Sequence, residues 1–308
     1  MKQSINDRIR SLCSQRNAVV LAHNYTLPEV QDIAHFVGDS LELAFRAAEA
    51  DAEVIVFCGV HFMAETAKIL KPEALVLMPD TEAGCPMADM ATAEDLRRMR
   101  DAHPGCAVVS YVNTTAAVKA ETDVCCTSSN AVAVIRSIPS TQKILFVPDR
   151  NLGSWAMGET GRELVLWDGF CPTHERILPG HVRRVIETHP DATLVAHPEC
   201  TEAVRKLADR VASTSGMLKF CRESNNTKFI VATEEGLLHR LRSESPNKLF
   251  LEAGPSMICP NMKLATLEKL LWCLEDLAGE ITVDPLIAAP ARQAIERMLA
   301  VSSTRQKQ

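Results

Sequence analysis

Three of the eleven cysteines, Cys85, Cys171 and Cys259, are the only ones followed directly by proline, and they stand 86 and 88 residues apart. Each closes a short apolar run typical of a strand, LVLMPD, LVLWDGF or LFLEAG. Near-equal spacing with shared flanks indicates a domain that is repeated three times. Three thiolates brought to one pseudo-threefold axis would hold a metal centre and leave one coordination position open.

The thiolates favour an iron–sulfur cluster over zinc. Structural zinc takes four protein ligands, usually in closely spaced pairs, and the chain has no C-x-x-C motif. Soft thiolates select iron–sulfur clusters, and a [4Fe–4S] cube with three cysteine ligands leaves one iron free as a Lewis acid. The alternative is that these cysteines are core residues that recur only because the domain recurs. The other eight cysteines are interpreted as small buried residues.

The same offsets align polar residues at the ends of predicted strands and before predicted helices. The aligned columns are His23, Tyr111 and His197; Tyr25, Asn113 and Glu199; and Ser40, Ser128 and the pair Ser213–Thr214. In parallel sheets, ligands bind beyond the carboxyl ends of the strands. If the three sheets share an orientation, we expect these columns and the cysteines to face one central cavity.

Each column can be interpreted as part of a functional site or as a purely structural feature. The histidines and tyrosines offer acid–base groups, and Glu199 would be a general base if burial raises its pKa. The hydroxyl residues could simply cap helices, or they could bind carboxylate and phosphate groups at helix N-termini. His174, three residues after Cys171, could contact either the cluster or a substrate, and the sequence leaves this open.

The composition excludes some classes of protein. Of the 308 residues, 46% are hydrophobic and 23% charged, which is ordinary for a globular protein, and the net charge of −6 gives no reason to expect a nucleic acid or an anionic membrane as partner. No apolar run is long enough to cross a membrane, and the polar start MKQSINDRIRSL predicts no signal peptide. We therefore expect a cytoplasmic protein with reduced thiols rather than disulfides.

Short strands rich in Val, Ile and Leu alternate with helices, which predicts an α/β fold with parallel sheets covered on both faces. Each unit is expected to run helix, strand, helix, strand, helix, strand, cysteine. A segment that begins at Thr266 resembles the start of a fourth copy, and a helix is expected over 290–300. We predict three homologous αβα domains around a pseudo-threefold axis, over 1–85, 86–172 and 173–260, with C-terminal helices in 261–308 that pack on them.

The sequence resembles the quinolinate synthase family of NAD biosynthesis. The matching strings run from residue 22 to 263: AHNY, GDS, GCPMADM, SYVNT, TSSNA, VPDRNLG, CPTH, AHPEC, STSGM and CPNMK. The resemblance implies three αβα domains around a [4Fe–4S] cluster. It also implies a transferase that condenses iminosuccinate with dihydroxyacetone phosphate to quinolinate, phosphate and water, with iminosuccinate supplied by an L-aspartate oxidase or dehydrogenase.

By this resemblance Cys85, Cys171 and Cys259 are the cluster ligands, and Tyr25 moves protons. The implied iminosuccinate-binding positions are His23, Ser40, Tyr111, Asn113, Ser128, His197, Glu199 and Thr214. We take Tyr25, Glu199 and His23 as the catalytic candidates and include Ser213 with Thr214 in substrate binding. Some family members carry a further C-x-x-C near the third ligand, but this chain has Ser256 there, so a disulfide switch is not expected.

Two other kinds of protein would use a similar set of residues. An aconitase-like iron–sulfur hydro-lyase also needs three cysteines and an open iron. An iron–sulfur electron carrier or sensor would need a fourth cysteine ligand and no acid–base column, so the pattern disfavours it.

Overall fold

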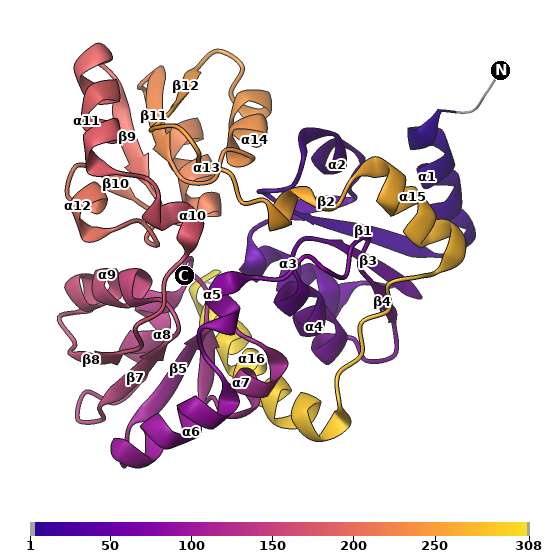
Figure 1. Cartoon of the computed structure of the whole chain (residues 1–308), viewed down its shortest axis with the longest axis horizontal. Helices are drawn as coiled ribbons and strands as arrows, with labels where there is room; N and C mark the ends of the chain where they lie inside the picture. The colour runs from indigo at the N-terminus through magenta and orange to yellow at the C-terminus, as the bar shows by residue number, and fades with distance from the viewer. Residues whose placement is uncertain (1–3, 307–308) are drawn as a thin grey trace.

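The computed structural model describes residues 4–306, with side chains as far as residue 302. Three lobes surround a common centre, and their chain segments follow one another around it (Figure 1). Each lobe contains one four-stranded parallel sheet, with orders β2-β1-β3-β4, β6-β5-β7-β8 and β10-β9-β11-β12. The α/β class and the three αβα units are therefore confirmed, and each sheet lies inside one of the predicted ranges. The exact cuts between those ranges stay a proposal.

The first unit has one more helix–strand pair than the sequence indicated. Its elements are α1 (Ile5–Gln15), β1 (Ala18–His23), α2 (Pro28–Ile33), β2 (Phe36–Gly38), α3 (Ser40–Glu49), β3 (Val54–Cys58), α4 (His61–Leu70), β4 (Leu75–Leu77) and α5 (Pro86–Asp89). The expectation of three strands per unit was wrong, because β2 is an edge strand of three residues. Such short edges carry little hydrophobic pattern.

The second and third units repeat this order. The second contains α6 (Ala93–Ala102), β5 (Ala107–Tyr111), α7 (Ala116–Ala120), β6 (Val124–Cys126), α8 (Ala131–Ser137), β7 (Ile144–Val147), α9 (Arg150–Thr160), β8 (Leu164–Leu166) and α10 (Pro172–Glu175). The third contains α11 (Pro179–Thr188), β9 (Thr193–Ala196), α12 (Glu202–Arg205), β10 (Arg210–Val211), α13 (Thr214–Glu223), β11 (Lys228–Ala232), α14 (Leu237–Glu244), β12 (Leu249–Glu252) and the 3₁₀ helix η1 (Asn261–Lys263).

Alternate strand residues separate one shared core from three outer cores. Leu21, Phe146 and Phe229 face a central core that runs through all three units. Their neighbours in the strands face away and pack under the outer helices of each unit. Because successive side chains point to opposite faces of a strand, each sheet is buried on both sides.

The C-terminal segment returns to the beginning of the chain. Helix α15 (Leu267–Asp276), capped by Thr266, packs beside α1 and on β3, so the predicted fourth first helix covers the sheet of the first unit (Figure 1). Helix α16 (Pro285–Gln306) contacts α4, α7, α8 and β6 and so joins the first two units. It begins five residues before the expected start at Pro290. Among the described residues, no helix is long and apolar enough to cross a bilayer.

Candidate active site

The three Cys-Pro sequences start the short helical turns that follow the fourth strand of each unit. Cys85 and Cys171 are the N-cap residues of α5 and α10, and Cys259 lies just before η1. Proline suits this place because the first turn of a helix has no acceptor for its N–H. All three thiols line one cavity at the centre of the molecule, about 970 Å³ including its open mouth. No fourth cysteine is among the described residues that line this cavity.

Burial raises the pKa of all three thiols, that of Cys85 to about 12. Backbone N–H groups of the following helical turns act in the opposite direction, because they donate hydrogen bonds to the sulfur atoms. Uncharged thiols are therefore favoured unless a bound cation compensates for the thiolates. This arrangement suits soft metal ligands rather than free nucleophiles.

The central cavity also receives every predicted site residue except Ser213. His23 ends β1, Tyr111 ends β5 and His197 directly follows β9, and all three are buried. The expected convergence of cysteines and polar columns is thus confirmed. Its physical cause is the parallel orientation of the strands within each sheet, whose carboxyl ends meet at the centre.

The two histidines share one hydrogen-bonding arrangement. Nδ1 of His23 accepts the N–H of Tyr25 at 3.2 Å, and Nδ1 of His197 accepts the N–H of Glu199 at 3.3 Å. Burial lowers the pKa of His23 to about 4 and that of His197 to about 3, so both rings are neutral at pH 7. Each ring therefore carries its proton on Nε2, which makes that nitrogen a hydrogen-bond donor.

The hydroxyl residues lie at helix starts, but not in the way that capping predicts. The N-cap of α3 is Asp39, with Ser40 as the first helical residue, and the N-cap of α8 is Asn130, so capping by Ser40 and Ser128 is wrong. At α13, Ser213 is the cap and Thr214 the first helical residue. The Ser213 side chain accepts the Gly216 N–H, which explains why Thr214, and not Ser213, lines the cavity.

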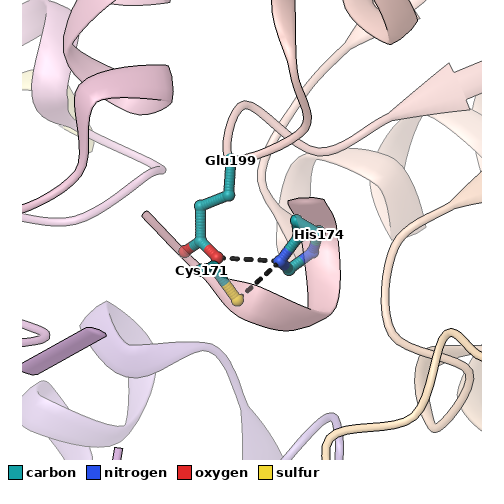
Figure 2. Close-up of side chains that lie close together, drawn as sticks. All are labelled: Cys171, His174 and Glu199. Atoms are coloured by element: carbon teal, nitrogen blue, oxygen red, sulfur yellow. Dashed lines mark hydrogen bonds and ion pairs between the residues drawn. The ribbon is translucent and has the colours of Figure 1, made fainter. Parts of the chain in front are cut away.

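Tyr25 belongs to a buried chain of hydrogen bonds that joins the first and third units. Its hydroxyl lies 2.6 Å from Thr233 Oγ1, which lies 2.9 Å from Nε2 of His174. Nδ1 of His174 lies 2.8 Å from Glu199 Oε2 and 3.1 Å from the Cys171 sulfur. Figure 2 shows the thiol and the carboxylate converging on this ring nitrogen. We call Tyr25, Thr233, His174 and Glu199 the relay.

Glu199 is also held by Tyr111, whose hydroxyl donates to Oε1 at 2.5 Å. Burial alone would raise the pKa of Glu199, but the imidazoles of His174 and His197 and the hydrogen bonds from His174 and Tyr111 outweigh it. The pKa therefore lies well below its usual range, so the condition under which Glu199 would act as a general base, a pKa raised by burial, is not met. Burial and the nearby Glu199 charge raise the pKa of Tyr25 well above its usual range, so this tyrosine stays protonated.

Sequence reasoning missed Thr233 and left His174 open. Thr233 directly follows β11, so the rule that placed His23 at the end of β1 could have found it. The structure also shows an unpaired polar atom in the cavity, which the sequence could not show. Asn113 lines the cavity, and its buried Oδ1 has no hydrogen-bond partner among the described residues, as expected of a group that binds a ligand.

Two sets of side chains in this cavity could hold metal. The first is the three thiols. The second consists of Cys171, His174 and Glu199, whose donor atoms lie within 4.8 Å of one another. In the second set, however, His174 and Glu199 already satisfy each other by hydrogen bonding, and His174 is also engaged by Thr233.

The fold and the site define an α/β enzyme in which a buried acid–base chain adjoins three thiols at the junction of three repeated units. The family model described as quinolinate synthetase A protein matches residues 7–300, and the chain belongs to that family. Its relatives include proteins named quinolinate synthase from Desulforudis audaxviator, 55% identical over 95% of this chain and 97% of the relative, and Geobacter sp. strain M21, 52% identical over 97% and 98%. A third relative of that name, from Thermodesulfovibrio yellowstonii, is 50% identical over 96% and 98%.

Proposed function

We propose that this enzyme condenses iminosuccinate with dihydroxyacetone phosphate to quinolinate, phosphate and water, in the biosynthesis of NAD. The observation that carries the proposal is one cavity that joins three thiols, two neutral histidine donors and the relay. Ring formation from these substrates needs a new C–C bond, an imine and loss of water. Each of these steps moves protons, which is the work that the relay can do.

The residues present fit a [4Fe–4S] cluster held by Cys85, Cys171 and Cys259. The three units each supply one soft ligand to the same cavity, and the absence of a fourth cysteine among the described lining residues would leave one iron open. When bound, such a cluster supplies a Lewis acid that polarises an oxygen or nitrogen of the substrate. We favour the three thiols over the Cys171, His174 and Glu199 set because the latter two residues are engaged in the relay.

Substrate binding is proposed for the polar columns. Nε2–H of His23 offers a neutral donor to carboxylates, and Nε2–H of His197 lies 3.2 Å from Ser128 Oγ, whose own hydroxyl proton can then be donated to a substrate. Ser40 and Thr214 stand at the N-termini of α3 and α13, where helix dipoles favour anions. Asn113 provides the unpaired amide oxygen for an N–H of the substrate. The remaining binding positions are Tyr111, Ser128 and Glu199, with Ser213 holding the start of α13 in place.

The relay can exist in two protonation states. In the neutral state, Nδ1–H of His174 donates to Glu199, Nε2 accepts from Thr233, and the Tyr25 hydroxyl donates to Thr233. The Tyr25 oxygen is then free to accept a proton from a substrate. As it does so, the original hydroxyl proton of Tyr25 passes to Thr233 and the Thr233 proton passes to Nε2 of His174, so that both hydroxyl groups are restored and Glu199 stabilises the resulting imidazolium. The relay thus stores one proton, with Tyr25 and Glu199 at its ends.

The test is to purify the protein without oxygen, measure iron and sulfide, and supply iminosuccinate with dihydroxyacetone phosphate. We expect a stoichiometric cluster and quinolinate as product. An aconitase-like hydro-lyase would dehydrate a hydroxy acid and form no pyridine ring from this pair. Full activity in preparations without stoichiometric iron would refute the cluster assignment.

The location and the supply of substrate follow from the same proposal. The cavity takes small molecules, and we propose that an L-aspartate oxidase or dehydrogenase provides iminosuccinate. All eleven cysteines are free thiols. Reduced thiols are typical of the cytoplasm, where we place the protein.

A further inference from the structure

Glu234, at the carboxyl end of β11, is a buried carboxylate whose partners tie together the loop of the third thiol. Oε1 accepts the backbone N–H of Cys259 at 3.0 Å and lies 2.8 Å from Nζ of Lys263. Oε2 accepts the N–H of Gly236 at 2.7 Å. The carboxylate therefore holds the Cys259 loop at both of its ends, against the end of β11.

Lys263 extends this network to the first unit. Its Nζ also donates to the backbone carbonyl of Tyr25 at 2.7 Å. Gln31 also joins the segment around Tyr25 to Gly236, because its Nε2 lies within hydrogen-bond distance of the carbonyl oxygens of Asn24, Thr26 and Gly236. A Cβ on Gly236 would lie 2.8 Å from the Tyr25 Cα, so the two backbones touch and this position needs glycine.

Two groups of different function are therefore connected through one ion pair. On one side is the backbone of a thiol proposed as a cluster ligand, and on the other is the backbone of the tyrosine that ends the relay. The Tyr25 hydroxyl also bonds Thr233, the residue before Glu234. The segment that follows β11 therefore holds this tyrosine directly through its side chain and, by way of Lys263, through its main chain. A shift of the Cys259 loop would therefore be transmitted to the Tyr25 backbone through Glu234 and Lys263.

We propose that the Glu234–Lys263 ion pair is a positioning device that couples the placement of Cys259 to that of Tyr25, so that the tyrosine is ordered for catalysis only when the third thiol is held. This inference rests on the proposed function for the role of Tyr25. Neither Glu234 nor Lys263 is assigned a proton-transfer step. Their action is mechanical, through the two main-chain contacts.

The test compares Lys263→Met with Lys269→Met as the matched control. Lys269 also pairs with a carboxylate, Asp80, at 2.5 Å, but it lies on α15 away from the cavity. For Lys263→Met we expect an unchanged iron and sulfide content, kcat lowered about tenfold or more, and KM within about threefold, since small misplacement of a reacting group reduces turnover. The control should retain wild-type kinetics.

Hydrogen exchange provides a readout that does not depend on activity. We expect amide exchange in residues 24–31 to rise when the cluster is removed from the wild type with a chelator. It should already be raised in loaded Lys263→Met. Unchanged exchange in this segment in both cases would overturn the proposal, as would equal effects of Lys263→Met and Lys269→Met. A wild type that forms no quinolinate would sink the proposed function, while the exchange result would still decide the coupling.

If Lys263→Met does not fold, Glu234→Gln provides the milder change. The amide oxygen can still accept the Cys259 N–H, but the variant loses the ion pair with Lys263 and the acceptor for the Gly236 N–H. The same rise in exchange over 24–31, with the cluster retained, is expected. Wild-type exchange and kcat in this variant would contradict the proposal.

Discussion

Glu199 shows how neighbours decide the charge of a buried group. Its carboxylate is buried, yet His174, His197 and Tyr111 keep it ionised. It is therefore a weak base by itself, and its value lies in stabilising a proton on His174. The same buried surroundings keep both tyrosines protonated and His23 and His197 neutral.

Replacing Glu199 with Gln should preserve the cluster and remove most of the turnover. The amide oxygen can still accept from Tyr111, but it no longer stabilises an imidazolium at His174. We expect kcat to fall about 100-fold or more, the lower bound for loss of acid–base catalysis. Turnover and visible absorption of the same anaerobic sample measure both effects, and full activity would reject the proposed role.

Thr233→Val tests the middle of the relay. Valine has nearly the same shape but carries no proton between His174 and Tyr25, so kcat should fall at least about tenfold with the cluster intact. Thr233→Ser restores a hydroxyl and should recover most of the activity. Equal activity of the valine and serine variants would show that the chain carries no proton.

The buried state of His23 predicts a pH-dependent contribution to stability. The unfolded residue has a pKa of about 6.5, and the folded one about 4. The unfolded state therefore binds more protons between these values, so the stability is fully present above pH 6.5 and is lost as the pH falls toward 4. Between pH 7.5 and 5.5 the wild type should lose about 1 kcal/mol more than His23→Gln, measured by anaerobic denaturant unfolding. Parallel losses in the two proteins would contradict this.

At the scale of elements, the short segment between α15 and α16 pairs with the first sheet. Residues 279–281 run antiparallel past β4: Gly279 accepts from the Met78 N–H and the Ile281 N–H donates to Val76, both at 2.8 Å. This contact covers the edge of the first sheet and directs the chain from α15 toward α16. Gly279 makes it possible, with φ at +82° and the place of a Cβ only 2.2 Å from the Met78 oxygen.

Gly279→Ala should therefore destabilise the protein by about 2 kcal/mol or more, because a left-handed backbone cost and a clash with main chain add together. Gly161→Ala is the control. Its φ is +67°, but nothing lies within 4 Å of a Cβ there, so only the backbone cost of about 1 kcal/mol remains. Denaturant midpoints measure both, and equal losses would mean that the close approach carries no cost.

At the scale of the whole molecule, three units share one central core and one cavity. Each unit contributes one thiol, so cluster binding would join segments that are distant along the chain. Helices α15 and α16 close the arrangement by returning to the first two units (Figure 1). The candidate active site therefore needs all three units together, because no single unit supplies the whole lining of the cavity.

Cys171→Ser should abolish the visible absorption of the anaerobic protein, because two thiols from two units do not hold the cluster. Cys273→Ser is the matched control. Cys273 is buried in the outer core of the first unit and donates to the Ala278 carbonyl, a bond that serine can keep. Its absorption should equal the wild type, and retention of absorption in Cys171→Ser would remove that residue from the ligand set.

The sequence alone determined the repeat, the parallel α/β class and the convergence of the cysteines with the polar columns. These depend on spacing and on strand ends, which duplication preserves in one register. The edge strands β2, β6 and β10 were not predicted, because two or three residues are too few to show the alternation of apolar and polar side chains that marks a strand. Only the tertiary structure decided that Asp39 rather than Ser40 caps α3, that Glu199 stays ionised, and that His174 joins Tyr25 through Thr233. Each of these depends on contacts of a few ångströms, local at Asp39 and between units at Glu199 and Tyr25, and distances along the chain do not encode them.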